Sequence, residues 1–337
     1  MNYLYTIFRK IGHINYNYRE ALLMKSPSLF NRINIEFNAE GAMLRGWLYT
    51  PNTSEENFPA IIMSHGYGSL KEMYLDAFAE HFANNGFAVL VYDHRNFGDS
   101  DGFPRQEINP YEQVLDFQHA ITFICTLKEI DRSRIGIWGT SYSGGHVLQV
   151  AAMDKRISCV VAQVPTVSGS QAALRRVQPD EVPTLLNTFY DDRENRMLGG
   201  KPAYKKIVAE TTDEQGIYQN EEAVKWYLKA GKRSPNWRNE VTIRSIDLSR
   251  SYEPGKYISM ISPTPLLILV AADDIVTPTD LTLAAYEEAR EPKKLVIIDG
   301  HHFTPYIEKF DIYSNEALKW FTQHLKKDFS STIPAMK

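Results

Sequence analysis

Three short segments, each placed after an apolar run, carry side chains that together could perform nucleophilic catalysis. Residues 139–145 read Gly-Thr-Ser-Tyr-Ser-Gly-Gly and follow the apolar run 135–138. A serine hydroxyl is a weak nucleophile, so it needs a base within hydrogen-bond reach. Residues 271–278 contain two aspartates and residues 299–303 contain two histidines, which could supply an orienting carboxylate and that base. The order serine, aspartate, histidine is one that acyl-transferring enzymes use.

Two serines compete for the role of nucleophile, because each satisfies half of the pattern G-x-S-x-G. Ser141 has Gly139 two residues before it, and Ser143 has Gly145 two residues after it. The apolar run ends at Trp138, so a tight strand-to-helix turn must follow at once, and this favours Ser141. Ser143 then falls in the first turn of the next helix, where a serine is well tolerated.

The residue types alone leave the acid and the base open. Asp273 and Asp274 both follow a strand-like run, and the bland alternative for each is loop solvation or helix capping. His301 and His302 both follow the last strand-like run, where the base is expected. One histidine of this pair could simply face solvent or support the other.

A tetrahedral intermediate needs two backbone N–H groups directed at its oxyanion. One is expected from Tyr142, the residue after the nucleophile. The other is expected from the loop His65-Gly-Tyr-Gly68, with Tyr67 N–H as the donor and Gly66 allowing close approach. His65 is predicted to be a structural hydrogen-bonding residue.

Short apolar runs alternate with helical patterns along the chain, which predicts a mostly parallel sheet covered on both faces. Strands are expected near 33–37, 43–49, 60–63, 87–92, 134–138, 157–164, 266–270 and 295–298. Helices are expected near 70–85, 111–127, 142–153, 280–290 and 308–325. Parallel strands place their carboxyl ends at one edge, where ligand chemistry is expected.

One long segment breaks the alternation and is expected to form a helical cap. The interval 168–262 is polar and aromatic, and a structureless loop of that length is improbable in a compact domain. The predicted organisation is an arm at 1–30, a core formed by 31–167 and 263–337, and a cap at 168–262. Cap residues are expected to contact the substrate, whereas a mobile surface insertion is the alternative.

The composition of the 337-residue chain is ordinary for a globular protein, with a net charge of −4. It gives no basic excess, so nucleic-acid binding is not expected. No apolar run is long enough for a membrane span, and no secretory signal is evident. Two cysteines, Cys125 and Cys159, are predicted to be buried thiols in a cytoplasmic protein.

Motifs for metal, dinucleotide or phosphate binding do not occur in the sequence, so no metal and no cofactor are expected. The expected partner is a small molecule. A dimer is compatible with the sequence.

The chain resembles the dienelactone-hydrolase-like branch of the α/β-hydrolases, and is similar to bacterial hydrolases of that branch and to fungal polyketide transferases. Five segments carry this resemblance, namely 64–68, 92–105, 139–145, 274–278 and 291–303. It implies an α/β-hydrolase fold with an eight-stranded sheet. The acid of the family matches Asp274 and its histidine matches His302. The family usually has glycine where this chain has Asn96 and His301.

The resemblance implies cleavage of an ester, a thioester or a related acyl compound. Ser141, His302 and Asp274 would act as nucleophile, base and orienting acid, through an acyl-enzyme intermediate. The alternatives are acyl transfer with the same three residues, peptide cleavage, and a non-catalytic binding protein that retains the fold.

Overall fold

The protein is built around one eight-stranded sheet. The structure, a computed structural model, describes residues 29–54, 56–211 and 213–326. The sheet has the order β1-β2-β4-β3-β5-β6-β9-β10. Within this sheet, only the pairs β1–β2 and β2–β4 are antiparallel. The strand bounds are β1 Phe30–Ala39, β2 Ala42–Pro51, β3 Phe58–Ser64, β4 Ala88–Tyr92, β5 Ile130–Thr140, β6 Ile157–Gln163, β9 Leu266–Ala271 and β10 Lys293–Ile298.

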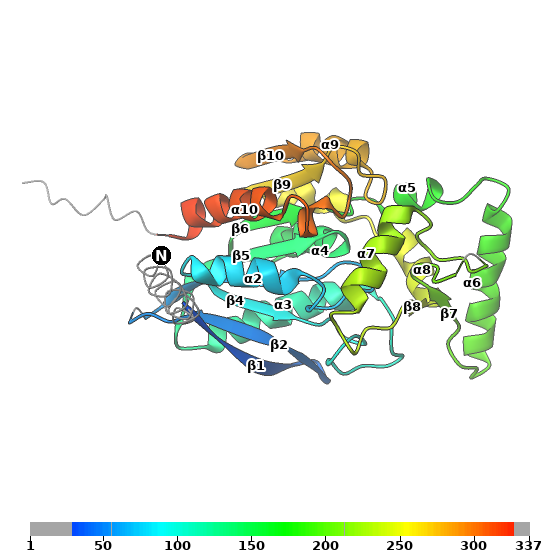
Figure 1. Cartoon of the computed structure of the whole chain (residues 1–337), viewed down its shortest axis with the longest axis horizontal. Helices are drawn as coiled ribbons and strands as arrows, with labels where there is room; N and C mark the ends of the chain where they lie inside the picture. The colour runs from blue at the N-terminus through cyan, green and yellow to red at the C-terminus, as the bar shows by residue number, and fades with distance from the viewer. Residues whose placement is uncertain (1–28, 55, 212, 327–337) are drawn as a thin grey trace, which may run out of the picture.

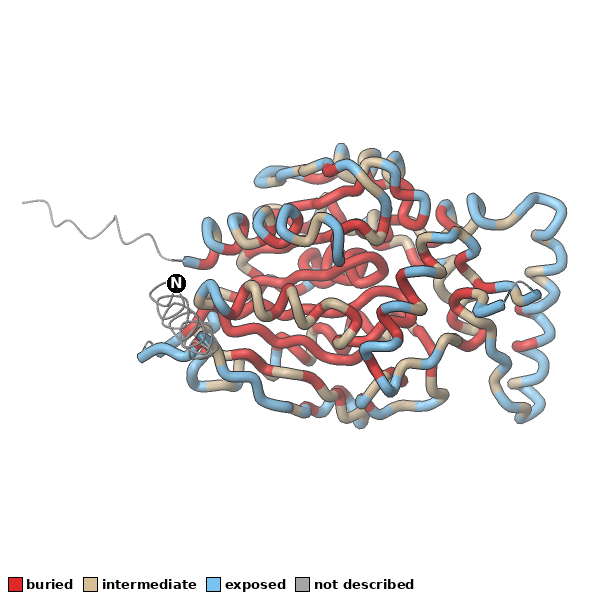
Figure 2. The backbone as a smooth tube through the Cα atoms, viewed as in Figure 1, coloured by how far each residue is buried: buried red, intermediate tan, exposed pale blue. Residues whose placement is uncertain are grey.

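Helices cover both faces of the sheet, because the central strands are apolar on both sides. α2 (Leu75–Asn84) and α10 (Phe310–Leu325) pack on one face, against side chains such as Met63 and Trp138. α3 (Pro110–Thr126), α4 (Tyr142–Met153) and α9 (Thr279–Glu288) pack on the other, against side chains such as Ile62 and Ile137. The predicted α/β architecture is therefore confirmed, and Figure 2 shows the burial concentrated in the sheet.

The segment between β6 and β9 forms the insertion, which lies at one end of the sheet in Figure 1. It contains α5 (Gly169–Leu174), α6 (Val182–Met197), α7 (Glu221–Gly231) and α8 (Ile243–Arg250). It is not wholly helical, because β7 (Tyr204–Lys206) pairs with β8 (Glu240–Thr242). After the cap helices, η1 (Pro254–Met260) returns to the core, where Ile258 joins the apolar cluster under the sheet.

The helix expected from residue 70 begins later, at Leu75. A tertiary contact explains the difference, because the Lys71 N–H donates to Asp93 Oδ1 at 2.9 Å instead of entering a helix. Tyr74 has a left-handed backbone (φ 73°), which also prevents an earlier start. The late start leaves residues 65–74 as a loop above the sheet edge.

The predicted arm at 1–30 lies almost entirely outside the described residues. None of the described helices combines the length and apolarity needed to cross a bilayer.

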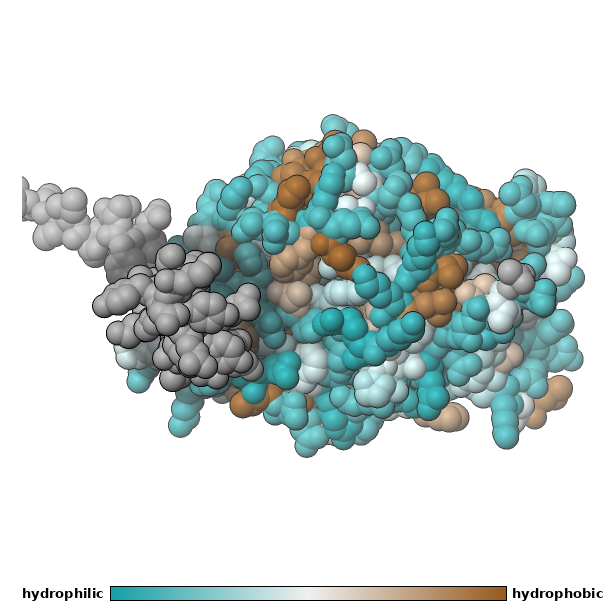
Figure 3. Space-filling model, in the orientation of Figure 1, coloured by the Kyte–Doolittle hydropathy of each residue, from teal (hydrophilic) through white to brown (hydrophobic). Residues whose placement is uncertain are grey.

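The face seen in Figure 3 is mostly hydrophilic, with apolar side chains scattered across it.

Candidate active site

Ser141 occupies a sharp turn between β5 and α4. Its backbone has φ 56° and ψ −117°, a region that side-chain-bearing residues rarely adopt. Two hydrogen bonds hold it there: the Ser141 N–H donates to the Gln163 carbonyl and the Ser141 carbonyl accepts from the Thr166 N–H, each at 2.9 Å. A strained residue of this kind costs on the order of 1–3 kcal/mol and persists where its surroundings enforce it.

Glycines around the turn allow the close packing that it needs. A Cβ at Gly139 would overlap the Ser143 carbonyl. A Cβ at Gly144 would meet Pro165 Cα at 2.7 Å, and one at Gly145 would meet the Thr166 carbonyl oxygen at 2.6 Å. The turn and the start of α4 are therefore pressed against the chain that follows β6, leaving no room for side chains.

The structure brings the three predicted side chains together from three separate segments. His302 Nε2 lies 2.9 Å from Ser141 Oγ, and His302 Nδ1 lies 2.7 Å from Asp274 Oδ2. A carboxylate can only accept, so Nδ1 carries the proton and Nε2 is left to accept from the serine hydroxyl. All three side chains are buried.

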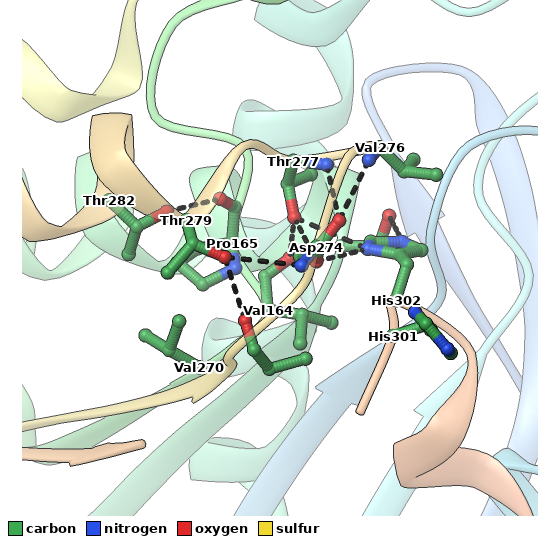
Figure 4. Close-up of polar contacts among 12 residues, drawn as sticks. Val164, Pro165, Val270, Asp274, Val276, Thr277, Thr279, Thr282, His301 and His302 are labelled. Carbon is green, nitrogen blue, oxygen red and sulfur yellow. Dashed lines mark hydrogen bonds and ion pairs between the residues drawn. The ribbon is translucent and has the colours of Figure 1, made fainter. Parts of the chain in front are cut away.

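Asp274 is held by its own loop, as Figure 4 shows. Its Oδ1 accepts the Val276 and Thr277 N–H groups, each at 2.8 Å, and Thr277 Oγ1 lies 2.8 Å from Oδ2. These partners leave the carboxylate in one orientation, with Oδ2 directed at the imidazole. Asp274 and the adjoining His302 thus form a fixed pair before any substrate arrives.

The neighbouring residues that competed for these roles lie elsewhere. Asp273 is exposed. His301 is exposed, and its Nε2 lies 3.1 Å from Glu222 Oε1 in the cap helix α7. Ser143 is fully buried, and its hydroxyl donates to the His65 carbonyl. None of the three makes a hydrogen bond to the Ser141–His302–Asp274 set among the described contacts.

Three buried histidines lie beneath the turn. The ring of His94 is 4.6 Å from that of His65 and 5.5 Å from that of His146. Burial lowers the pKa of His65 to about 4 and that of His146 to about 3. Burial also lowers the pKa of His94 well below its ordinary value, and its Nε2 lies 2.6 Å from Ser64 Oγ. The cluster is therefore neutral at pH 7.

The two predicted oxyanion donors belong to segments next to the nucleophile. Gly66 is so close that a Cβ there would stand 3.3 Å from Ser141 Oγ. Tyr67 follows it, and Tyr142 is the first residue of α4, whose N–H has no partner within the helix. In the described part of the chain, neither amide donates to a loop carbonyl or to a side chain. Both N–H groups therefore remain available for a ligand.

A cavity of about 470 Å³ lies between the sheet edge and the insertion. Three of its lining residues, Tyr67, Tyr142 and Thr166, belong to the core, and the others lie within 169–250. The cap part combines aliphatic side chains such as Leu185 and Ile246 with charged ones, namely Arg176, Asp180, Glu181, Lys205 and Arg250. A cavity of this size suits a small molecule.

Among the described residues, one group of carboxylates is compact enough to share a cation, namely Glu72, Asp93 and Asp99. Lys71 Nζ already lies 2.6 to 2.8 Å from all three. Burial disfavours the charged ammonium, but the carboxylates outweigh this effect and raise the pKa of Lys71. The group is thus an internal ion-pair network that anchors the loop before α2.

Comparison with known proteins identifies the family. Residues 40–304, more than three quarters of the chain, match the family described as X-Pro dipeptidyl-peptidase (S15 family). The chain belongs to this family of α/β-hydrolases. It is 32% identical to a thiohydrolase of Eupenicillium brefeldianum, over 82% of this chain and 89% of that protein. It is 34% identical to the quorum-quenching protein AidA of Acinetobacter baumannii strain MDR-ZJ06, over 85% and 90%.

Solved structures agree with this assignment. The crystal structure of the α/β hydrolase GrgF from Penicillium sp. sh18 superimposes with a TM-score of 0.76 at 27% identity, covering 88% of this chain and 99% of that one. The sequence-based prediction of an α/β-hydrolase that acts as a serine hydrolase is therefore confirmed.

The structure accommodates side chains at the two positions where the family resemblance implies glycine. Asn96 has a left-handed backbone (φ 71°), which asparagine tolerates better than most residues, and its Nδ2 donates to the Glu107 carbonyl at 3.0 Å. His301 has space for its side chain because that side chain extends to Glu222 in the cap. Neither residue displaces His302 or Ser141.

Sequence reasoning missed Thr277, although the sequence contained a signal for it. An aspartate whose carboxylate accepts N–H groups two and three residues further on is typical of an Asx turn. The spacing Asp274-x-x-Thr277 fits such a turn, and it puts a hydroxyl beside the carboxylate. The hydrogen bonds from Tyr227 and Trp237 of the insertion to the loop after β3 join residues far apart in the sequence, so they have no such local signal.

Gly66→Ala should lower kcat/KM about 10²-fold, the scale of losing one oxyanion donor. The added Cβ would stand 2.9 Å from Ser141 Cβ, so the loop that carries the Tyr67 N–H must shift. Steady-state kinetics on a p-nitrophenyl ester measure the effect. Gly41→Ala is the control, because that glycine (φ 95°) has open space around it and should lose stability only. Unchanged kcat/KM in Gly66→Ala would exclude this loop from the oxyanion site.

The free energy of unfolding should decrease as the pH falls from about 6.5 towards 4. The unfolded chain protonates its histidines below about pH 6.5, while folded His65 and His146, with pKa values of about 4 and 3, stay neutral. Each such histidine contributes up to about 1.4 kcal/mol per pH unit, a stabilisation present above pH 6.5. Urea titrations at pH 7, 6 and 5 measure the slope. His119→Gln, at a half-buried surface site, should keep it, whereas His146→Gln should reduce it.

Proposed function

We propose that this enzyme cleaves an ester or thioester through an acyl-enzyme formed on Ser141. The support is the geometry of the relay, with 2.9 Å from Ser141 Oγ to His302 Nε2 and 2.7 Å from His302 Nδ1 to Asp274 Oδ2. As Oγ attacks the carbonyl carbon, its proton passes to Nε2. Asp274 keeps the imidazole in the required tautomer and stabilises the imidazolium that forms.

Collapse of the tetrahedral intermediate then breaks the bond to the leaving group. The imidazolium gives its proton to the departing alcohol or thiol, and the acyl group stays on Ser141. Water then enters, gives a proton to the same nitrogen and attacks the acyl carbon. When the bond from Ser141 Oγ to that carbon breaks, the imidazolium returns the proton to Oγ and the acid is released. The N–H groups of Tyr67 and Tyr142 would stabilise the oxyanion in both halves of the reaction.

The substrate proposed here is a small acyl compound bound in the cavity under the cap. Two features support this: Tyr67 and Tyr142, the two proposed oxyanion residues, line the cavity of about 470 Å³, and relatives include a protein named thiohydrolase. Val177, Leu185, Ile217 and Ile246 give the cavity an apolar wall suited to an acyl chain.

We also propose that the enzyme is cytoplasmic, because its two cysteines are unpaired and the reducing cytoplasm keeps thiols unpaired. Cys159 is buried, as predicted, whereas Cys125 was predicted to be buried and is half-buried.

Acyl transfer is the second candidate, since a relative 30% identical to this chain is named polyketide transferase. The same acyl-enzyme would then react with an alcohol or amine held under the cap in place of water. Product analysis with added alcohols and amines separates the two activities. Release of free acid alone supports hydrolysis, and formation of the new ester or amide supports transfer.

Ser141→Ala should lower kcat for a p-nitrophenyl ester by at least about 10³-fold, because the nucleophile is removed. Asp274→Asn should lower it about 10³- to 10⁴-fold, because the amide favours the wrong imidazole tautomer. Circular dichroism should show that both variants are folded.

Asp273→Asn is the matched control for the acid, since Asp273 is the exposed neighbour of Asp274. It should keep kcat within about twofold of the parent, the range expected for a surface change. Ser141→Ala with parental turnover, or equal losses in the two aspartate variants, would contradict the proposed function.

A further inference from the structure

Two aromatic side chains of the insertion hold consecutive carbonyl groups of the core loop that follows β3. Tyr227 Oη donates to the Tyr67 carbonyl at 2.7 Å, and Trp237 Nε1 donates to the Gly68 carbonyl at 2.9 Å. Tyr227 is buried in α7, and Trp237 lies shortly after that helix, half-buried. The contacts join residues about 160 positions apart in the chain, so they exist only when the insertion is docked on the core.

The loop makes three hydrogen bonds of its own around this point. The Gly66 carbonyl accepts from His65 Nδ1 at 3.0 Å and from the Ser69 N–H at 3.3 Å, and the Ser69 hydroxyl lies 3.5 Å from the Tyr67 carbonyl. The bond from Tyr227 to the Tyr67 carbonyl, at 2.7 Å, is much shorter than the one from Ser69. Gly68 is left-handed (φ 59°), and a Cβ there would meet Ile207 Cδ1 of the insertion at 2.5 Å. The insertion therefore packs directly against the peptide that follows Tyr67, which adjoins the peptide that carries the Tyr67 N–H.

Neighbouring contacts extend the same attachment along the loop. Arg233 Nε donates to the Glu72 carbonyl at 2.9 Å, and Ser234 Oγ donates to Glu72 Oε2 at 3.1 Å. These bonds reach Glu72, which lies further along the loop than Tyr67 and Gly68. The tyrosine bond is made to the peptide directly after the one that carries the Tyr67 N–H, and the tryptophan bond to the peptide after that.

We propose that Tyr227 and Trp237 are positioning residues for the oxyanion site. By holding the carbonyls of Tyr67 and Gly68, they keep the Tyr67 N–H directed at the space beside Ser141 Oγ. The insertion would thus complete the active site in addition to covering it. This inference rests on the proposed function, because it assigns a role in stabilising the same tetrahedral intermediate.

Tyr227→Phe removes one hydroxyl and keeps the ring, which stacks at 5.9 Å on Tyr218. We expect kcat to fall about 10-fold with KM within about twofold, since misdirecting a donor costs less than the 10²- to 10³-fold of removing one. The inhibition constant of a boronic acid that forms a tetrahedral adduct should rise by the same factor. Trp237→Phe should show the same pattern, and the double variant should lose less than the product, because one loop is affected.

Tyr313→Phe is the matched control. Tyr313 is a buried tyrosine of α10 whose hydroxyl donates to a backbone carbonyl, that of Val270, at 3.3 Å. The Tyr313→Phe variant should lose about as much thermal stability as Tyr227→Phe, while its kcat per active site stays at the parental value. Active sites are counted by the endpoint of fluorophosphonate labelling, so partial unfolding does not imitate a catalytic loss.

Parental kcat and parental boronic-acid affinity in both Tyr227→Phe and Trp237→Phe would overturn the positioning role. The role would also be overturned if the losses of kcat in Tyr227→Phe and Trp237→Phe were no larger than the loss in Tyr313→Phe. A failure of the proposed function itself looks different, because Ser141→Ala would then retain turnover whatever the cap variants do.

Discussion

The left-handed backbone at Ser141 is the constraint on which the rest of the site depends. The residue is fixed by two hydrogen bonds to the chain at the end of β6, from its N–H to the Gln163 carbonyl and from the Thr166 N–H to its carbonyl. This conformation lifts the hydroxyl off the sheet edge, where the imidazole of His302 can reach it. The strain of about 1–3 kcal/mol is a small share of what the surrounding burial contributes.

The three sides of the site are built with different degrees of independence. The acid side is local, because Asp274 is held by N–H groups two and three residues further along its own loop. The floor is a neutral, fully buried histidine cluster that packs under the turn. The oxyanion loop depends most on distant segments, because Lys71 binds Asp93 and Tyr227 of the insertion binds the Tyr67 carbonyl, in addition to the bond from His65 to the Gly66 carbonyl within the loop. Catalytic geometry and cap docking are therefore connected through one short loop.

The sequence contained enough to predict the architecture because the central strands contain short apolar runs, such as 60–63 and 266–270, that alternate with helical patterns. Helix α4, expected at 142–153, has those bounds in the structure. The start of α2 could not be predicted locally, because the Lys71 N–H is taken by Asp93, which lies 22 residues away in the chain. The insertion was expected to be helical, and the short pair β7–β8 went unnoticed since three-residue strands leave almost no pattern.

The site was predictable where chain order and strand ends constrain it, and less so where neighbours compete. Asp273 and Asp274 are equivalent by sequence pattern, but in the structure Asp274 is buried and Asp273 is exposed. The same holds for His301 and His302, of which only the second turns inward to the carboxylate (Figure 4). The hydrogen bond from Tyr227 to the Tyr67 carbonyl joins segments far apart in the chain, and a single sequence has no pattern that indicates such a pair.

The most direct measurement of the central claim is to locate the covalent adduct of a fluorophosphonate probe by peptide mass spectrometry. The relay predicts one adduct per chain, on Ser141, formed rapidly in the parent and very slowly in His302→Ala. An adduct on Ser143, or labelling of Ser141 at the same rate without the imidazole, would contradict it.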